Sequence, residues 1–217
     1  MGSDWARLVL VRHGEVEANR SYRYLGRRDD VLTDAGRRQA EALAVALSEL
    51  PVDAVISSPL KRALDTAQTI AGPGGLAVEL EVRLLELDFG DWDGRSRAEV
   101  VATSEGDRRR VQAWEADPTL PVPGGESLAQ LQERVVNLAN DLTRARSGST
   151  LVLVSHMGPI KTLLLAALGL PLTAAARIFL DPATVSVVDW SSRPVVRLVN
   201  SHAHLGFAGA RWLGEGR

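Results

Sequence analysis

Residues 8–19 read LVLVRHGEVEAN, and this stretch decides the fold of the chain. Its apolar run does not alternate and stops at once at charged residues and a glycine, which predicts a strand buried on both faces that ends at an open sheet edge. Ligands bind at that edge in α/β sheets. Arg12 offers a planar fork of donors that matches phosphate, and a neutral imidazole at His13 has a nitrogen that attacks phosphorus or accepts a proton. From this stretch alone, a hydrogen-bonded histidine with no catalytic role is the alternative.

A second stretch, TLVLVSHMGPI at 150–160, repeats the same pattern. An unbroken apolar run ends in Ser155 and His156, and Gly158 and Pro159 then lead into an apolar helix. Parallel strands place their carboxyl ends at one edge of a sheet. If both runs are parallel strands of one sheet, His13 and His156 lie at the same edge.

Two further residues are candidates for the chemistry of such a site. Glu86 lies among leucines in RLLELDFGDWDG, so partial burial is expected to raise its pKa and to make it a general acid. Arg62 falls in the first turn of a helix expected to begin at Ser58 and Pro59, where a phosphate would meet both free backbone N–H groups and the guanidinium. The alternatives are a solvent-facing glutamate and a surface arginine.

Composition limits the class of protein. The 217 residues are 45% hydrophobic and 24% charged, which predicts one folded core without a disorder signature. A formal net charge of -2 argues against nucleic acid or an anionic membrane as the partner. There is no cysteine, the start MGSDWAR lacks the regions of a signal peptide, and no apolar run is long enough to span a membrane. We therefore expect a soluble, cytoplasmic protein.

The rest of the chain supplies alternating helical and strand patterns, which predict an α/β fold. Its elements are expected to be a loop at 16–32, a helix from Thr33 or Asp34 to Leu50, strands at 53–57 and 76–82, helices within 95–117, a break at 118–125, a helix from Glu126 or Ser127 to Ala145, and a hairpin at 184–199. Residues 95–125 are expected to be a helical cap over the strand edge. Its run Arg108–Arg110 is typical of a solvated face, with contact to an anionic substrate as the alternative. His202 and His204 are a weak candidate for a metal site, because no acidic residue or cysteine lies near them in the sequence.

Six segments in series resemble the histidine phosphatase superfamily, also called the phosphoglycerate mutase-like family, over nearly the whole chain. Each alone is weak, but their order and spacing together are as expected for that family. They are RHGE at 12–15 with Asn19 six residues after the histidine, GRRDDVLTDAG at 26–36, SSPLKRALDTA at 57–67, ELDFGDWDG at 86–94, PGGES at 123–127 and VSHMGPI at 154–160.

The resemblance implies a three-layer α/β/α sandwich with a mostly parallel sheet, as a single domain over 1–217 with a small helical cap. It implies His13 as the nucleophile that becomes phosphohistidine and Glu86 as the group that transfers protons. It assigns the phosphate pocket to Arg12, Asn19, Arg62 and His156, the last in its protonated form. Met157 stands where family members often have glycine, so it is a candidate for shaping the substrate, together with Trp92, Trp114 and Arg108–Arg110.

On this basis the sequence predicts a phosphomonoesterase, a histidine acid phosphatase-type hydrolase acting on a small phosphorylated metabolite. A mutase-type phosphoryl transfer is the alternative, but it needs a more extensive cap and a second anion site. A non-catalytic phosphate-binding protein is a third reading, although all the expected catalytic residues are present, and no GxGxxG follows the first strand to suggest a dinucleotide. We expect no cofactor and no metal, a small phosphorylated substrate or inorganic phosphate as partner, and leave a homodimer open.

Overall fold

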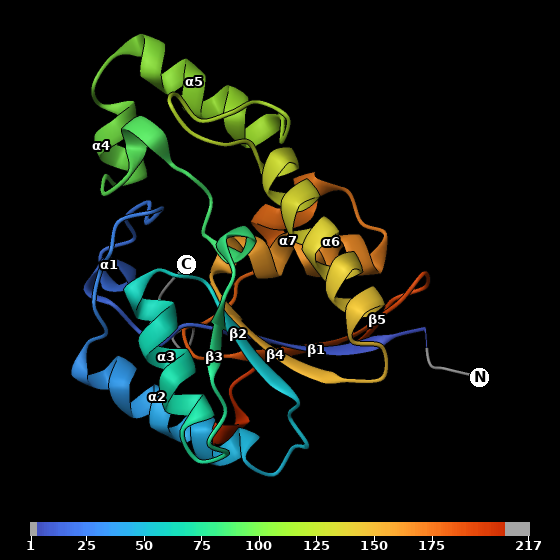
Figure 1. Cartoon of the computed structure of the whole chain (residues 1–217). Coiled ribbons are helices and arrows are strands. Elements are labelled where there is room, and N and C mark those ends of the chain that lie inside the picture. The colour runs from blue at the N-terminus through green and yellow to red at the C-terminus, as the bar shows by residue number, and fades with distance from the viewer. Residues whose placement is uncertain (1–3, 207–217) are drawn as a thin grey trace.

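The structure is a computed structural model that describes residues 4–206, and its core is one sheet of six strands in the order β3-β2-β4-β1-β5-β6 (Figure 1). The expected domain 1–217 and the N-terminal stretch 1–7 therefore lie partly outside the described residues. The strands are β1 (Ala6–Arg12), β2 (Ala54–Ser57), β3 (Val78–Leu80), β4 (Thr150–Ser155), β5 (Val185–Trp190) and β6 (Val195–Ser201). β1 to β4 are mutually parallel and β5 runs antiparallel to β1 and β6, so the sheet is mostly parallel as predicted.

Helices cover both faces of this sheet. They are α1 (Glu17–Arg20), α2 (Asp34–Leu47), α3 (Lys61–Ala71), α4 (Arg97–Val101), α5 (Glu105–Ala116), α6 (Leu128–Ala145) and α7 (Met157–Leu168), with short 3₁₀ turns η1 (Val82–Leu84), η2 (Gly90–Trp92), η3 (Leu172–Arg177) and η4 (Ala203–Leu205). α2 and α3 lie below the sheet in Figure 1, and α6 and α7 lie above it. The α/β/α sandwich predicted from the sequence is therefore confirmed.

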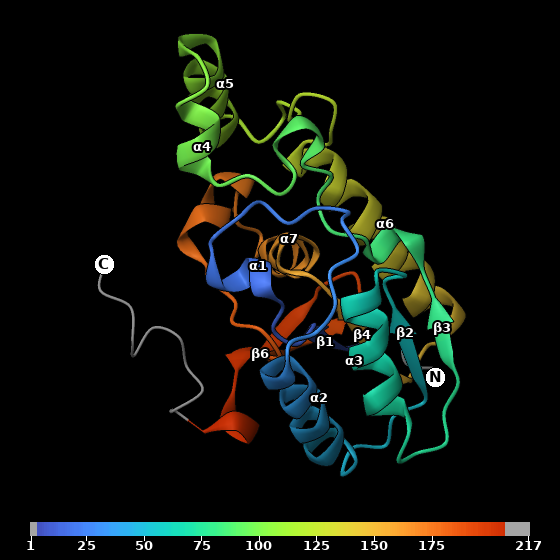
Figure 2. The same cartoon turned by 90° about the vertical axis from the view of Figure 1, so that its left-hand side faces the viewer.

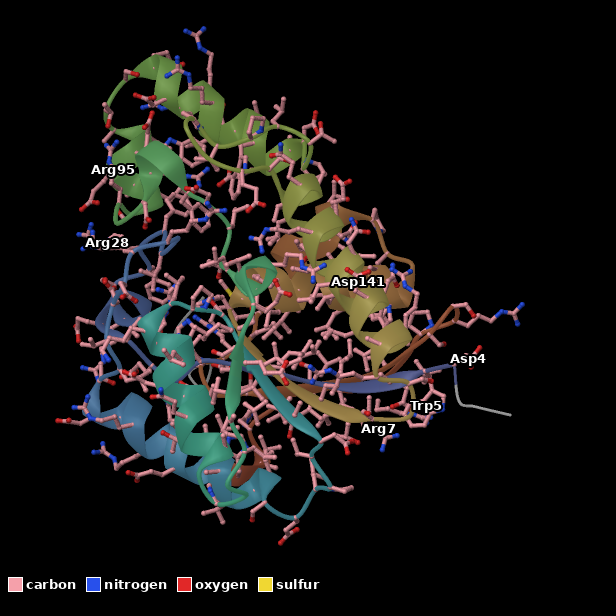
Figure 3. The ribbon with its side chains drawn as sticks, viewed as in Figure 1. Asp4, Trp5, Arg7, Arg28, Arg95 and Asp141 are labelled. Carbon is pink, nitrogen blue, oxygen red and sulfur yellow. The ribbon has the colours of Figure 1, made fainter. Side chains whose placement is uncertain are left out.

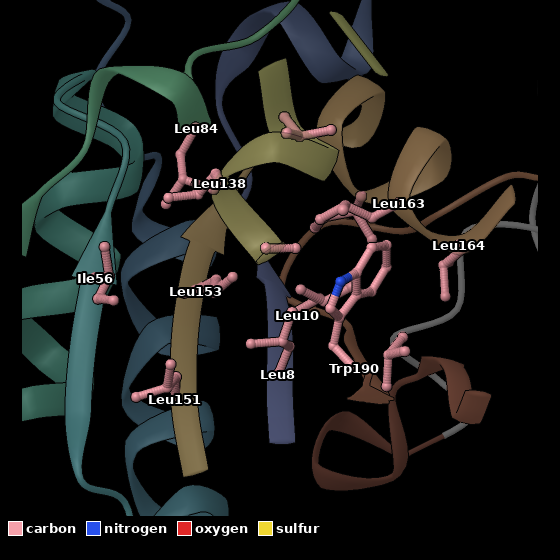
Figure 4. Close-up of a cluster of buried hydrophobic side chains, with 14 of the residues drawn as sticks. Leu8, Leu10, Ile56, Leu84, Leu138, Leu151, Leu153, Leu163, Leu164 and Trp190 are labelled. Carbon is pink, nitrogen blue, oxygen red and sulfur yellow. The ribbon is translucent and has the colours of Figure 1, made fainter. Parts of the chain in front are cut away.

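The unbroken apolar runs of the central strands explain this layering, because each strand is buried on both sides. Leu8 and Leu10 of β1 face α6 and α7 in one buried cluster, shown in Figure 4. Val9 and Val11 face α2 and α3 in the other. Side chains alternate along a strand, so an apolar residue at every position fills both layers at once.

The 95–125 segment lies apart from the two helical layers. It carries α4 and α5, which stand above the sheet beyond the end of α7 in Figures 1 and 2. A separate small cluster of Trp92, Val100, Val111 and Val122 holds it together. A capping box at Ser96 begins α4 near the start of the segment, and another at Ser127 begins α6 just after its end.

Several boundaries differ from those expected. α3 begins at Lys61 rather than at Ser58, because the backbone is still extended at Leu60; the Ser58 hydroxyl contacts His156 and also accepts from the Leu60 N–H at 3.4 Å. α2 ends at Leu47, three residues before Leu50, and the third strand is limited to 78–80 because it pairs with β2 over only three positions. The expected loop at 16–32 contains the short helix α1. Within residues 4–206, no helix is long and apolar enough to cross a membrane.

The end of β1 is packed tightly against the start of α2, where two glycines face each other. A Cβ placed on Gly36 would lie 2.2 Å from the Glu15 carbonyl oxygen, and one on Gly14 would lie 2.5 Å from the Gly36 carbonyl oxygen. Both obstacles are backbone atoms, which cannot rotate away as a side chain does. The backbone after His13 is therefore held by this close approach.

We expect Gly36→Ala to lower the free energy of unfolding by about 1–3 kcal/mol, the usual cost of overpacking, which outweighs alanine's gain in helix propensity of about 1 kcal/mol. Chemical denaturation measures it. Gly74→Ala is the matched control, because its added Cβ would meet nothing closer than 3.6 Å. Equal stability of Gly36→Ala and Gly74→Ala would show that the chain relaxes around the contact.

Candidate active site

His13 and His156 lie together at the carboxyl ends of two neighbouring parallel strands. Arg12 and Ser155 are register partners in β1 and β4, and each histidine is the next residue along its strand. The ring centroids are 5.1 Å apart. The sequence pattern of two apolar strands ending in histidine thus predicted their proximity correctly.

The surroundings of His13 fix which ring nitrogen carries its proton. Nδ1 lies 2.7 Å from the Gly14 carbonyl oxygen, which only accepts, so Nδ1 is the protonated nitrogen. Nε2 accepts from the Arg62 Nε–H at 3.3 Å. Burial and the charges of Arg62 and Arg12 hold the His13 pKa well below its usual value. The ring is therefore neutral near pH 7, with a lone pair on Nε2.

His156 is also fully buried, and its Nε2 lies 2.8 Å from the Ser58 hydroxyl. Its Nδ1 has no hydrogen-bond partner among the described residues. Burial and then the neighbouring Arg62 lower the His156 pKa well below its usual value. The protonated His156 expected from the resemblance is thus disfavoured by its protein surroundings, and only a bound anion would favour it.

Two buried arginines supply the positive charge of the site. Arg62 is fully buried; its terminal nitrogens donate to the carbonyl oxygens of Arg28, at 2.6 Å, and Gly26, at 2.8 Å, while its Nε faces His13. Arg12 is 5% exposed and donates to the Leu180 carbonyl oxygen. Arginine stays charged even when burial lowers its pKa, as it does at Arg62. The site is therefore a buried, positively charged pocket, which suits an oxyanion.

Glu86 is 7% exposed and is held by backbone donors. Its Oε1 accepts from the N–H groups of Leu87 at 2.8 Å and Gly158 at 3.1 Å. Burial raises the Glu86 pKa, against the opposing effect of these bonds and of the two arginines. A Cβ on Gly158 would lie 2.3 Å from Oε1, so the glycine of VSHMGPI leaves the space that the carboxyl group occupies.

These groups open into one cavity of about 550 Å³, which Arg12, His13 and Glu86 line at one end. Asn19 and Met157 line the same cavity. The Asn19 side-chain oxygen also accepts from the Val16 N–H at 3.0 Å, which closes the turn of α1. Arg62 and His156 are buried behind the lining.

Three residues at the site were missed in the sequence. Ser58 holds His156, and its position beside a predicted helix start favoured a cap instead. Arg134 of α6 donates to the Glu86 carbonyl oxygen at 3.1 Å and pairs with Glu126 of the PGGES motif at 2.7 Å, a contact across 48 residues that no local pattern reveals. Lys161, one turn after Met157 in α7, lines the cavity. Its spacing on the helix was the available signal.

Other residues that the sequence analysis singled out do not line the cavity. Arg108 and Arg110 are exposed and pair along α5 with Glu105 and Asp107, so the run is a solvated face as the pattern favoured. Trp92 is buried behind the cavity wall. His204 bonds to the Ala183 carbonyl oxygen. Among residues 4–206, no group of three or more metal-ligating side chains is found.

The fold and this pocket define a class of phosphate-handling histidine protein, and the comparisons agree with it. The model of the histidine phosphatase superfamily (branch 1) matches residues 8–201, so the chain belongs to that superfamily. Phosphoserine phosphatase 1 of Hydrogenobacter thermophilus is 37% identical over 92% of this chain and 94% of its own. Mycobacterial relatives that are 38% identical are longer, and the chain spans about half, 55%, of their length.

Solved structures give the same result. A mycobacterial glucosyl-3-phosphoglycerate phosphatase in complex with VO₃ superposes with a TM-score of 0.80 at 33% identity, covering 90% of this chain and 98% of that one. A putative α-ribazole-5'-P phosphatase from Escherichia coli gives 0.81 at 29% identity, covering 90% and 96%. The relatives therefore share the fold while their names give different substrates.

Lys161 offers a test of the pocket's charge. Burial lowers its pKa to about 8, so the ammonium is present below that pH and is lost above it. We expect Lys161→Met to weaken binding of inorganic phosphate about 5-fold near pH 7, as for one partly screened charge, and to have little effect above about pH 9.5. Titration calorimetry at each pH compares the variants directly, so that the ionisation of phosphate itself cancels.

Lys61→Met is the matched control, because Lys61 is the other lysine of the chain, is exposed and pairs with Asp65. It should bind phosphate like the parent at both pH values. A Lys161→Met effect that persists at high pH would mean that the side chain acts by packing rather than by charge.

Proposed function

We propose that the protein is a phosphoric monoester hydrolase that acts on a small phosphorylated metabolite through a phosphohistidine intermediate. The single observation that carries this is the state of His13: a neutral ring whose unprotonated Nε2 faces a pocket of two buried arginines. Such a nitrogen is a nucleophile, and the arginines match the charge of a phosphoryl group. We also propose, from the sequence, that the enzyme is of the histidine acid phosphatase type and that it is cytoplasmic.

In the first half-reaction His13 Nε2 attacks phosphorus in line, so the N–P bond forms as the P–O bond to the alcohol breaks. Glu86, whose raised pKa favours the protonated carboxyl, gives its proton to the departing oxygen. In the second half-reaction the Glu86 carboxylate takes a proton from water, which attacks the phosphohistidine. The N–P bond breaks, inorganic phosphate leaves, and both residues return to their starting states.

The phosphate pocket is assigned to Arg12, Arg62, His156 and Asn19, with Met157 beside the substrate. Phosphoryl transfer needs mainly positioning and positive charge around the equatorial oxygens. The buried arginines provide the charge. The hydrogen bonds that Arg62 donates to the carbonyl oxygens of Gly26 and Arg28 keep its guanidinium in one orientation, and His156 Nδ1 has hydrogen-bonding capacity left for a phosphate oxygen.

Hydrolysis is favoured over mutase-type transfer by the charges farther out in the cavity. A mutase must hold a second phosphate there. Among the described lining residues, Arg23 pairs with Glu99 at 2.7 Å, and Lys161 lies near the catalytic group, where the charges of Arg12 and Glu86 act on it, so neither offers an unpaired cation to a second phosphate farther out. We propose the 95–125 segment as the cap, since Trp114 and Glu115 of α5 line this part of the cavity.

Two variants separate the proposed roles. His13→Ala should abolish phosphoenzyme formation, because it removes the nucleophile. Glu86→Gln should slow hydrolysis of alkyl phosphates by about 10² to 10⁴-fold, the usual worth of general acid catalysis, while p-nitrophenyl phosphate still phosphorylates His13 because its leaving group needs little protonation. Rapid-quench kinetics should then show a burst of p-nitrophenolate. Equal losses on both ester types without a burst would mean that Glu86 only maintains the pocket.

We also expect hydrolysis to continue after exhaustive dialysis against a chelator, because arginine and histidine supply the charge that a metal would otherwise provide. Turnover of p-nitrophenyl phosphate with and without added magnesium, manganese or zinc measures this. Activity that disappears on dialysis and returns with one of these ions would overturn the assignment of the phosphate charge to Arg12 and Arg62.

A further inference from the structure

The cavity continues well past the catalytic residues, and its outer part is apolar. Its volume of about 550 Å³ is in the range of pockets that enclose a whole small molecule, so it has room for the alcohol as well as the phosphoryl group of an ester. The outer lining comes from segments far apart in the chain: the loop before α2, the stretch after Glu86, α5, the start of α6 and η3.

Three aromatic rings form one wall of this outer part. Tyr24, Phe89 and Trp114 all line the cavity, and their ring centroids are 4.9 Å apart for Tyr24 and Phe89 and 6.1 Å apart for Phe89 and Trp114. Trp92, 2% exposed, supports the wall from behind, 5.6 Å from Trp114. Rings that pack on one another at these distances form a pre-ordered surface rather than a set of loose side chains.

Other side chains that line the outer cavity are aliphatic or, at Met157, a thioether. Leu128, Met157, Leu172 and Ala176 line it, from α6, α7 and η3. An amino acid or sugar packed against these rings and aliphatic side chains would lose water there without gaining hydrogen bonds from them, and an unpaired buried polar group costs free energy. These side chains therefore favour an apolar occupant.

Two charged side chains of the outer cavity, Arg23 and Glu115, are already paired, and Lys161 lies toward the catalytic end, where the charges of Arg12 and Glu86 act on its pKa. Arg23 pairs with Glu99, and Glu115 pairs with Arg97 at 2.5 Å. The Trp114 Nε1 is different, because it is buried and no partner for it is found within the described residues. A buried indole N–H normally has an acceptor. The nitrogen is shielded from solvent, so an occupant of the cavity contacts the ring carbons of Trp114.

Resting on the proposed function, we propose that the alcohol part of the substrate carries a flat apolar ring system that packs against Tyr24, Phe89 and Trp114. The site would thus discriminate between phosphomonoesters by the ring rather than by a carboxylate, an ammonium group or sugar hydroxyls.

The test compares esters whose leaving alcohols are all primary, so that chemistry is matched and only the attached group differs: 2-phenylethyl phosphate, ethyl phosphate and O-phosphoserine. We expect kcat/KM for the phenylethyl ester to exceed that for ethyl phosphate by about 10- to 100-fold, the worth of burying one phenyl group. Phosphoserine should be no better than ethyl phosphate. A phenylethyl-to-ethyl ratio near one, or phosphoserine as the best of the three, would overturn the proposal.

Variants place the effect at the wall. Trp114→Ala should reduce the phenylethyl-to-ethyl ratio about 10-fold, and Trp114→Phe should retain most of it because a ring remains. Trp5→Ala is the control for loss of a tryptophan: Trp5 lies beside Arg7 at the end of the molecule away from Arg95 and the 95–125 segment, as Figure 3 shows. It should leave the ratio unchanged. If Trp114→Ala is folded by circular dichroism and its phenylethyl-to-ethyl ratio equals that of the parent, the assignment of the ring to this wall is overturned. If Trp114→Ala is unfolded, the binding of phenylethyl and ethyl compounds to the parent and to Trp114→Phe replaces it as the test.

Binding of stable analogues separates this proposal from the proposed function. 2-Phenylethylphosphonate and ethylphosphonate are not hydrolysed, so calorimetry measures the ring's contribution even if the protein turned over no ester at all. Tighter binding of the phenylethyl compound by about 10-fold or more would support the aromatic wall, and absence of turnover would then refute only the hydrolase. Equal binding of the two phosphonates would refute the wall whatever the activity.

Discussion

Parallel hydrogen bonding between β1 and β4 decides where the polar groups of the site lie. With Arg12 opposite Ser155, the next residue on each strand is a histidine, and the His13 N–H donates to the Ser155 carbonyl oxygen at 3.0 Å. The Ser155 hydroxyl in turn donates to the Leu84 carbonyl oxygen at 2.7 Å, which fixes the segment that leads to Glu86. A shift of one residue would turn every side chain of β4 to the opposite face, so two filled apolar layers protect this register.

Burial then sets the charges. The pKa values of His13 and His156 are lowered and that of Glu86 is raised, so burial drives each of these groups toward its neutral form. Arginine cannot respond in this way, and Arg12 and Arg62 remain cations. Burial thus accounts for a neutral imidazole at His13 with an unprotonated Nε2, a carboxyl group at Glu86 that favours its proton, and two fixed positive charges beside them. Separating the two cations from water is unfavourable, and carbonyl oxygens such as those of Gly26 and Arg28 offset part of that cost.

The sequence predicted the parts of this arrangement that are local or follow from strand direction. Two buried strands ending in histidine predicted the shared edge, and the leucines around Glu86 predicted its burial. Contacts between distant segments could not be predicted in that way: Ser58 with His156 is separated by 98 residues, and Arg134 with the Glu86 backbone by 48. The predicted start of α3 was wrong because the backbone is still extended at Leu60, although a serine before a proline is a common helix start. Tyr24 and Phe89 carried no periodic signal, because they lie in loops whose meeting depends on the whole fold.

The glycines of the sequence motifs also depend on contacts between distant segments. Gly14 of RHGE and Gly36 of the TDAG segment face each other backbone to backbone, and Gly158 of VSHMGPI faces the Glu86 carboxyl from another segment. Each glycine is required by what a different part of the chain places against it, so its role cannot be assigned from its own neighbours. These motifs therefore constrain one another. A larger side chain at Gly36 would displace the backbone that follows His13, and one at Gly158 would displace the Glu86 carboxyl group. Among the described residues, no glycine contact of this kind lies among the rings and aliphatic side chains of the outer cavity. If ring and aliphatic surfaces set the fit of the occupant there, as we propose, members of a family with one catalytic geometry can differ in the alcohol that each accepts.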